Sequence, residues 1–277
     1  MRAIVPCISV VLAGAIVSTN ALPAAPATGP LRVHPDNPRY FADRAGRAVY
    51  LTGSHTWNNL LDSAPIGKPL RTFDYDAYLD LLQPRHHNFI RMRAWEAGEN
   101  QSYYEPVPYV RTASGKYDLN QFNPAYFDRL RSRVAAARDR GVDVSVMLFQ
   151  GWSIYSHGYS NPWPLHPFNA ANNVNGINGD ADGDGEGKEV HSLKVPAVTR
   201  LQEAYLRKVV DTVNDLDNVL YEVTNETAIS AAKGELAVEW IEPATGKTVN
   251  GGAMPGGARR DLKAPFAGPS VLDLKAK

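Results

Sequence analysis

The sequence predicts an α/β fold in which about four strand–helix units form a parallel sheet, followed by a small antiparallel β tail. Short apolar runs alternate with helix-spaced amphipathic segments up to about residue 230. Such alternation is typical of βαβ units, whose strands are parallel. From about residue 235, short segments are separated by Gly and Pro, which is typical of antiparallel strands.

The N-terminus has the pattern of a secretory signal peptide. Arg2 precedes an apolar run at 3–17 that is too short to span a bilayer. Small residues follow, with a cleavage pattern at 25–27 and an alternative at 19–21. We therefore expect residues 1–27 to be removed, and the protein to be secreted or periplasmic without a membrane partner afterwards. A buried N-terminal helix is the alternative. The single cysteine, Cys7, lies in this segment, so the mature chain would contain no disulfide.

The composition gives no indication of a nucleic-acid or membrane partner. The chain has 29 Lys and Arg against 29 Asp and Glu, without a polybasic run. Hydrophobic residues make up 44% of the sequence, so a sizeable core can form. Neither a Gly-rich phosphate loop nor a Gly-x-Ser-x-Gly motif is present, and we expect no cofactor.

The first elements are a hairpin, a helix and a strand. Apolar residues on both sides of the turn at 42–46 predict a hairpin that ends near Leu51, and its second strand is taken as the first strand of the parallel sheet. Helical spacing of tyrosines and leucines predicts a helix over 72–83, capped by Thr72. A strand is expected at 88–92, followed by a long polar and aromatic loop.

The next helix has the clearest end signals. Asn123 is a preferred N-cap residue, Pro124 suits the first helical position, and Gly141 is a typical stop. A strand is expected at 142–149, followed by a loop at 153–195 that is rich in Asn, Gly and Asp.

The remaining elements are a helix, a strand and the tail. Leu201, Tyr205, Val209 and Val213 share one helical face. An apolar strand at 219–223 then runs into an adjacent Asn and Glu. Tail strands are expected at 235–243 and 270–274.

Polar or aromatic residues follow each strand of the predicted parallel sheet. Parallel strands bring their carboxyl ends to one face, so we expect these side chains to line one open cleft. The residues are His55, Trp57, Arg91, Arg93, Trp95, Gln150, Trp152, Asn225 and Glu226, of which Arg91 lies within the strand at 88–92. Alternatively, the tryptophans and His55 belong to the core, and Glu226 is a solvated or salt-bridged loop carboxylate.

Four stretches in this order resemble the first four strand ends of the clan A glycoside hydrolases. They are VYLTGSHTWNNL (49–60), NFIRMRAW (88–95), QGWS (150–153) and VLYEVTNE (219–226). They are most similar to the secreted cellulase-like group that includes the family 5 and family 140 types. The resemblance covers about residues 31–228 and implies a partial (β/α)₈ barrel at 28–230. The tail at 235–277 resembles the last strands of a β-sandwich accessory domain.

The resemblance implies roles for these residues in a retaining glycoside hydrolase that acts on a plant-type or other polysaccharide. Glu226 corresponds to the general acid/base, Asn225 to the residue that holds a sugar hydroxyl, and Arg91 to the arginine that supports the nucleophile. The remaining six residues of the cleft would bind the carbohydrate. A retaining mechanism requires a second carboxylate about 5–5.5 Å from the first.

The sequence has no match for that second carboxylate. A complete barrel needs about 250 residues, and four further units would need about 125, whereas about 50 residues follow Glu226. Glu235, Glu239 and Glu242 lie in the tail, outside the motif of the nucleophile. Strands five to eight are therefore expected to be missing between residues 228 and 235, and hydrolysis to be weak. The alternative is a non-catalytic carbohydrate-binding remnant or a fragment without function.

One acidic stretch resembles the beginning of a calcium loop. Asp180, Asp182, Asp184 and Gly185 have the expected spacing, but position twelve, where such a loop has a bidentate Glu, is His191. We therefore expect a solvated loop and no metal site, with calcium as the alternative.

Overall fold

The computed structural model describes residues 25–94, 102–154, 161–225, 235–242, 247–255, 262–266 and 271–276. Contacts divide the chain into one unit up to Asn225 and a second from Glu226 onward, and each is described by itself. The predicted signal peptide up to residue 24, Trp95 and Glu226 lie outside the described residues. Within these ranges, the helices are too short or too polar to cross a membrane.

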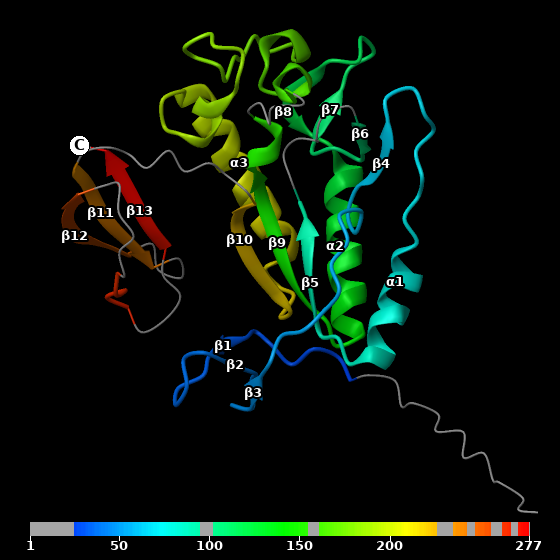
Figure 1. Cartoon of the computed structure of the whole chain (residues 1–277), viewed down its shortest axis with the longest axis vertical. Coiled ribbons are helices and arrows are strands. Elements are labelled where there is room, and N and C mark those ends of the chain that lie inside the picture. The colour runs from blue at the N-terminus through cyan, green and yellow to red at the C-terminus, as the bar shows by residue number, and fades with distance from the viewer. Residues whose placement is uncertain are drawn as a thin grey trace, which may run out of the picture. The chain divides into compact units, whose positions relative to one another are not determined.

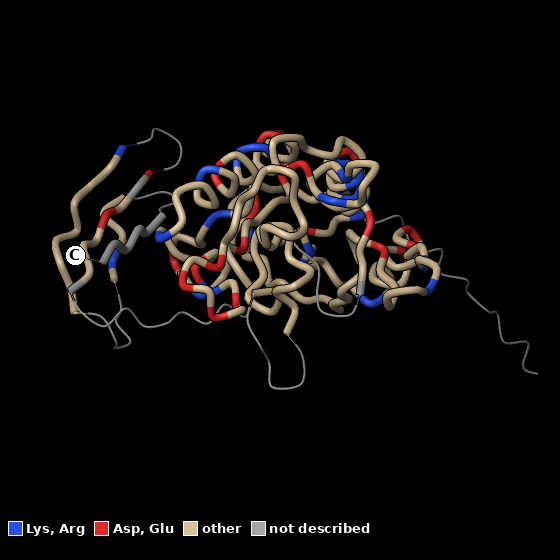
Figure 2. The backbone as a smooth tube through the Cα atoms, turned by 90° about the horizontal axis from the view of Figure 1, so that it is seen from above, with Lys and Arg blue, Asp and Glu red and all other residues tan. Residues whose placement is uncertain are grey.

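The first unit alternates strands and helices (Figure 1). Its elements are β1 (Arg32–Val33), β2 (Phe41–Ala42), β3 (Ala48–Val49), β4 (Asp62–Pro65), α1 (Tyr75–Leu82), β5 (Phe89–Arg93), β6 (Ser102–Glu105), β7 (Tyr109–Arg111), β8 (Tyr117–Phe122), α2 (Pro124–Asp139), β9 (Asp143–Gln150), α3 (Pro196–Val213) and β10 (Val219–Asn225). Figure 2 shows basic and acidic residues interspersed along this unit.

A parallel sheet with strand order β10-β9-β5 forms the centre of the first unit. Ile90 lies opposite Val144, and Tyr221 lies opposite Val146. Figure 1 shows the three arrows side by side and pointing the same way, with β1 to β3 at their amino-terminal end. Because α2 precedes β9 and α3 connects β9 to β10, the predicted α/β organisation is confirmed.

The first predicted strand of this sheet takes a different form. β3 pairs with β2 in an antiparallel sheet, and the chain after it runs along β5 without regular strand pairing. The amides of Asn88 and Phe89 donate to the carbonyl of Thr52 over 2.9 and 3.1 Å. Asn88 also uses its side chain: Oδ1 accepts from the amide of Thr52 and Nδ2 donates to the carbonyl of Tyr50.

A second asparagine, Asn59, forms similar hydrogen bonds at the other end of this irregular segment. Its Oδ1 accepts from the amide of Arg93, and its Nδ2 donates to the carbonyl of Arg91. Side-chain amides therefore satisfy backbone groups that a regular ladder would otherwise pair. Gly53 lies so close to β5 that a Cβ there would collide with the carbonyl of Phe89, which explains why glycine occupies this position.

The core lies between the parallel sheet and the three helices. Ile90 and Met92 of β5 and Val144, Val146 and Leu148 of β9 belong to one buried apolar cluster. The helices contribute residues that include Leu79, Leu130, Val134, Tyr205 and Val209. Side chains alternate along a strand, so Arg91 and Arg93 point to the opposite face of the sheet. That face also carries Ser145 and the buried Met147 of β9 and Glu222 of β10.

The helix signals were largely correct. Asn123 caps α2, where its Oδ1 accepts from the amide of Ala125 over 3.2 Å, and Gly141 has a positive φ of 75° at the end. The predicted cap of α1, Thr72, was wrong. Asp74 takes this role because it directly precedes the first helical residue, and its Oδ1 accepts from the amide of Ala77 over 3.0 Å.

The segment expected to be a long polar loop contains short strands instead. β6 pairs with β4, and β7 pairs with β8, each antiparallel. In β8, buried Tyr117 and Leu119 alternate with more exposed Asp118 and Asn120, which is the period-two signal of a half-buried strand. This signal was available in the sequence. The loop prediction overlooked it because polar residues dominate the segment.

The second unit is an antiparallel sheet, as predicted. Its strands are β11 (Glu235–Glu242), β12 (Lys247–Pro255) and β13 (Val271–Ala276), in the order β12-β11-β13. β12 is one strand rather than several glycine-punctuated segments. A register shift opposite Val238 and Glu239, and a φ of +86° at Gly252, accommodate its irregularity. The origin of this sheet in a β-sandwich domain stays a prediction.

Candidate functional site

Residues at the carboxyl ends of β9 and β10 form a hydrogen-bonded group with Arg91, the third residue of β5. Asn225 of β10 donates through Nδ2 to Oε1 of Gln150 on β9 over 3.3 Å. Its Oδ1 accepts from Nη2 of Arg91 on β5 over 2.9 Å. The amide of Trp152 donates to the same Gln150 oxygen over 3.1 Å. The structure thus brings four of the predicted site residues together from three adjacent strands.

Glu222 is a member of this group that the sequence analysis missed. Arg91 donates through Nε to Oε2 of Glu222 over 2.8 Å, and through Nη2 to Oε1. The Arg91 and Glu222 side chains are 32% and 28% exposed. A signal was present in the sequence, because a glutamate inside an otherwise apolar strand requires a partner when the strand is buried.

His55 and Trp57 lie next to each other before β4. Their ring centroids are 4.4 Å apart and the rings are almost perpendicular. His55 is solvent-exposed and Trp57 is 41% exposed, so neither is a core residue. Partial desolvation lowers the pKa of His55, and the positive charge of Arg91 lowers it further.

Arg93, which is predicted to bind substrate, is buried in the structure and supports a neighbouring segment. It is 1% exposed, and its Nη1 donates to the carbonyl of Trp57 over 3.2 Å. Its guanidinium lies 4.3 Å from the ring centroid of Tyr104. Arg93 therefore connects the end of β5 to the segment that carries Trp57.

The site residues differ in their access to solvent. Gln150 and Asn225 are 1% and 7% exposed, and Trp152 is half-buried. Arg91, Glu222, His55 and Trp57 retain exposed surface. Buried amides thus form the base of the site, and a cation, a carboxylate and aromatic rings form its accessible part. Glu226, the predicted acid/base, follows Asn225 but lies outside the described residues, as does Trp95.

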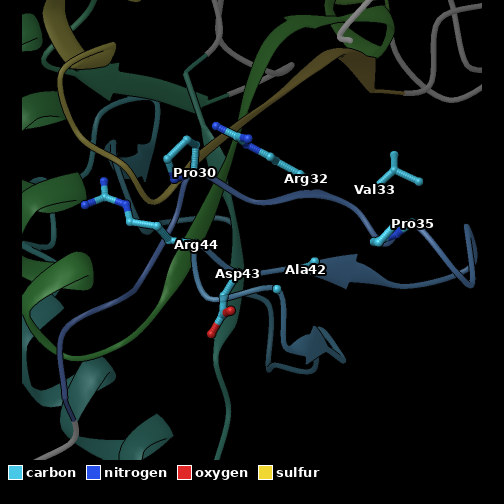
Figure 3. A pocket seen from close by; sticks show the side chains of 8 residues that line it. Pro30, Arg32, Val33, Pro35, Ala42, Asp43 and Arg44 are labelled. Carbon is cyan, nitrogen blue, oxygen red and sulfur yellow. The ribbon is translucent and has the colours of Figure 1, made fainter. Parts of the chain in front are cut away.

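Two cavities of about 380 Å³ each lie away from the hydrogen-bonded group. The first lies between β1 and β2 and is bordered by Asp43 and Arg44 (Figure 3). It belongs to the amino-terminal end of the parallel strands, opposite the predicted active face (Figure 1). Backbone and side-chain hydrogen bonds from Arg47 lower the pKa of Asp43.

The second cavity is lined by aromatic and polar side chains. Its residues are Ile66, Tyr103, Tyr104, Val107, Arg111, Ser114, Gly115, Lys116, Tyr117, Leu165, Ala171 and Asn172. Tyr104 also lies under the guanidinium of Arg93, so this cavity is connected to the strand-end site through one cation–π contact. Four of these residues, Tyr103, Tyr104, Arg111 and Tyr117, lie on β6, β7 and β8, which the sequence did not predict.

Comparisons with known proteins give only distant structural matches. No family model and no curated protein matches the sequence. The exo-β-1,4-mannosidase Op5Man5 from Opitutaceae bacterium strain TAV5 is 20% identical with a TM-score of 0.40, covering 68% of this chain and 27% of that chain. A β-mannanase from the blue mussel Mytilus edulis is 14% identical with a TM-score of 0.38, covering 73% and 46%. The chain spans less than half the length of either structure, and its similarity to these glycoside hydrolases is partial.

Proposed function

We propose that this chain binds carbohydrate at the carboxyl ends of β5, β9 and β10, as one half of a retaining glycoside hydrolase site. The observation that supports this proposal is the hydrogen-bonded group of Arg91, Gln150 and Asn225. Carboxyl ends of parallel strands are where α/β scaffolds place ligand-binding side chains. The accessible Trp57 ring is suited to stacking on the apolar face of a sugar.

Asn225 is oriented for recognition of a hydroxyl group. Arg91 bonds its oxygen and Gln150 accepts from its nitrogen, so the amide has one orientation. An amide has two donors and two acceptor positions, and one of each is engaged here. The remaining N–H and lone pair suit a hydroxyl that both donates and accepts. In the proposed site, Glu226 acts beside it as general acid/base.

Hydrolysis by this chain alone should be weak. A retaining mechanism needs a nucleophilic carboxylate that faces the acid. Glu222 is the carboxylate at the described site, and its two oxygens are engaged by Arg91 in a bidentate pair. We assign Glu222 to positioning Arg91 rather than to nucleophilic attack. The second candidate function is therefore carbohydrate binding without turnover, which the accessible aromatic rings favour.

The proposal is tested by measuring binding and turnover separately. The mature chain is run in affinity gels that contain plant polysaccharides, including β-mannans, and is assayed on a panel of aryl glycosides. We expect retardation by at least one polysaccharide and turnover near background. Trp57→Ala should abolish the retardation. Tyr50→Ala, which removes an aromatic side chain that is 74% exposed near the opposite end of β5, should not.

Two outcomes would contradict the proposal. Equal retardation of wild type and Trp57→Ala would show that carbohydrate does not bind at the carboxyl ends of these strands. Robust turnover that Glu226→Gln abolishes would show that a second catalytic carboxylate exists, and that the chain is a complete enzyme.

Export with removal of residues 1–27 is also part of the proposal. It is supported by Arg2 and the apolar run at 3–17. N-terminal sequencing of protein recovered from the medium or periplasm should begin near residue 28, and a sequence that begins at Met1 would contradict it.

A further inference from the structure

We propose that the segment between β9 and α3 binds a calcium ion through Asp180, Asp182 and Glu189. One carboxylate oxygen of each residue lies within 4.8 Å of the others. Calcium binds oxygen at 2.3–2.6 Å, so two ligands on opposite sides of one ion are about 5 Å apart. The three oxygens therefore fit a single calcium shell.

Glu189 provides independent evidence for a cation. The residue is 6% exposed, and its buried Oε2 has no hydrogen-bond partner. Lys194 forms a long ion pair with Oε1 over 3.9 Å, but its side chain is 71% exposed and this contact leaves Oε2 without a partner. One exposed ammonium at this distance offsets little of the charge of a buried carboxylate that lies next to two other carboxylates. A divalent cation supplies the compensating charge.

The two aspartates retain coordinating capacity. Asp180 accepts one backbone amide at each oxygen, from Gly183 and Gly185 over 2.8 and 3.0 Å, and Asp182 accepts one from Asp184 over 3.2 Å. Each ionised carboxylate has about four acceptor positions, so positions for an ion remain. Asp184 is engaged elsewhere, since it accepts from the amide of Glu186 and lies 3.7 Å from Lys188.

The structure also changes the sequence argument against calcium. The spacing placed His191 at position twelve, where a bidentate glutamate was expected. Glu189 lies at position ten, on the 3₁₀ helix Lys188–His191, and this turn brings its carboxylate back to the aspartates. The acidic ligand is therefore present two residues earlier than the motif requires.

Ligand chemistry favours calcium over other cations. Three carboxylate oxygens suit a hard cation, whereas zinc and copper prefer sites with nitrogen or sulfur. Magnesium requires near-ideal octahedral geometry and gives up its water reluctantly, whereas calcium accepts irregular loops. The loop here is irregular, with positive φ angles at Gly183 and Gly185.

Calcium at this position would stabilise the loop that follows β9. Gly187 packs so closely against Trp163 that a Cβ would collide with its ring. The Asn161 side chain donates to the carbonyl of Gly185 over 2.9 Å. An ion bound to residues 180–189 would therefore order the segment from 161 onward. This inference does not depend on the proposed carbohydrate site.

The test uses the mature chain after EDTA treatment and dialysis, titrated with CaCl₂ up to about 10 mM, since extracellular calcium modules bind at about 10⁻⁴–10⁻³ M. Calcium at about 100 times its Kd should raise the Tm by about 5 °C or more. Glu189→Gln should lose this shift. In EDTA, its Tm should equal or exceed that of wild type, because the buried negative charge is gone. Glu186→Gln, a matched substitution next to Lys188 in the same loop, should keep the shift.

Three results would overturn the inference. The first is that calcium neither shifts the Tm of wild type nor gives binding heat. The second is that Glu189→Gln retains the full Tm shift. The third is that MgCl₂ shifts the Tm of wild type as much as CaCl₂ does. If Glu189→Gln does not fold, Asp182→Asn at the exposed ligand decides the same question, because it should weaken calcium binding at least tenfold.

Discussion

Arg91 and Glu222 form a bidentate ion pair across the central strand of the parallel sheet. Arg91 belongs to β5 and Glu222 to β10, and β9 lies between them. Neighbouring strands are about 4.8 Å apart, so the pair spans about 10 Å of sheet. Arg91 also bonds Asn225, so the same guanidinium fixes both the strand interior and the strand end. This pair thereby links the stability of the sheet to the geometry of the proposed site.

Substitution of Arg91 should destabilise the fold. Arg91→Ala leaves a partly buried Glu222 without its cation and Asn225 without its donor, so the free energy of unfolding should fall by about 1–3 kcal/mol. Urea denaturation followed by circular dichroism measures this change. Arg131→Ala is the matched control, because Arg131 forms a bidentate pair with Asp215 whose side chains are 47% and 56% exposed. Arg131→Ala should lower the free energy of unfolding by less than about 1 kcal/mol. Equal losses in the two variants would show that the Arg91 pair contributes no more to stability than an exposed ion pair.

Asp143 should make stability depend on pH. Burial raises the pKa of its carboxyl to about 7, and the negative charge of Asp217 contributes. Between about pH 4 and 7 the folded state holds a proton that the unfolded state has lost. The contribution of Asp143 to the free energy of unfolding is therefore full below about pH 4, and it is lost as the pH rises from about 4 through 7. The stability of Asp143→Asn relative to wild type should therefore increase as the pH rises from about 4 to 7. At pH 8 the variant should be more stable than wild type by about 2–4 kcal/mol, relative to their difference at low pH.

Denaturation curves of wild type and Asp143→Asn at pH 5 and pH 8 measure this difference. Asp139→Asn, at an exposed aspartate near the end of α2, should follow wild type at both pH values. A difference between Asp143→Asn and wild type that does not change with pH would contradict the raised pKa.

The cap of α2 should contribute measurable stability. Asn123 accepts the amide of Ala125, and its Nδ2 donates to the carbonyl of Val107 over 2.9 Å. Asn123→Ala should lower the free energy of unfolding by about 1–2 kcal/mol. Asn123→Ser retains a capping oxygen but loses the Val107 bond, so thermal melting should place it between wild type and Asn123→Ala. A serine variant no better than alanine would mean that the Val107 bond, rather than the cap, stabilises the helix start.

The outer edge of β10 should promote self-association. β10 is the last strand of the parallel sheet in the described part of the chain, and Val223 and Tyr221 are 69% and 41% exposed. Exposed apolar edge strands pair readily with other chains. Val223→Lys should reduce concentration-dependent association in light scattering, with the unfolding midpoint nearly unchanged. Leu193→Lys, at a leucine that is 64% exposed outside the strands, serves as the control. An equal effect of both substitutions would exclude an edge-specific cause.

The sequence predicted the α/β order and part of the site, for identifiable reasons. Asn123, Pro124 and Gly141 act locally, so their pattern is visible in the sequence. The pairing of Arg91 with Glu222 depends on strands brought together by the fold, and no local signal specifies it. The irregular segment beside β5 was taken for a strand because side-chain bonds by Asn88 and Asn59 replace the ladder, which apolar periodicity does not reveal.

The distance in sequence between Arg91 and Glu222 sets when the site can form. The two residues are 131 positions apart in the sequence. By contrast, one short turn joins β2 to β3, and another joins β7 to β8. Local hairpins close rapidly, and contacts of such long sequence separation carry the largest loop-closure entropy. During synthesis, the strand ends therefore meet only after β10 has left the ribosome. In pulse-labelled hydrogen exchange, amides that pair β10 with β9 should become protected after those of the β7–β8 hairpin.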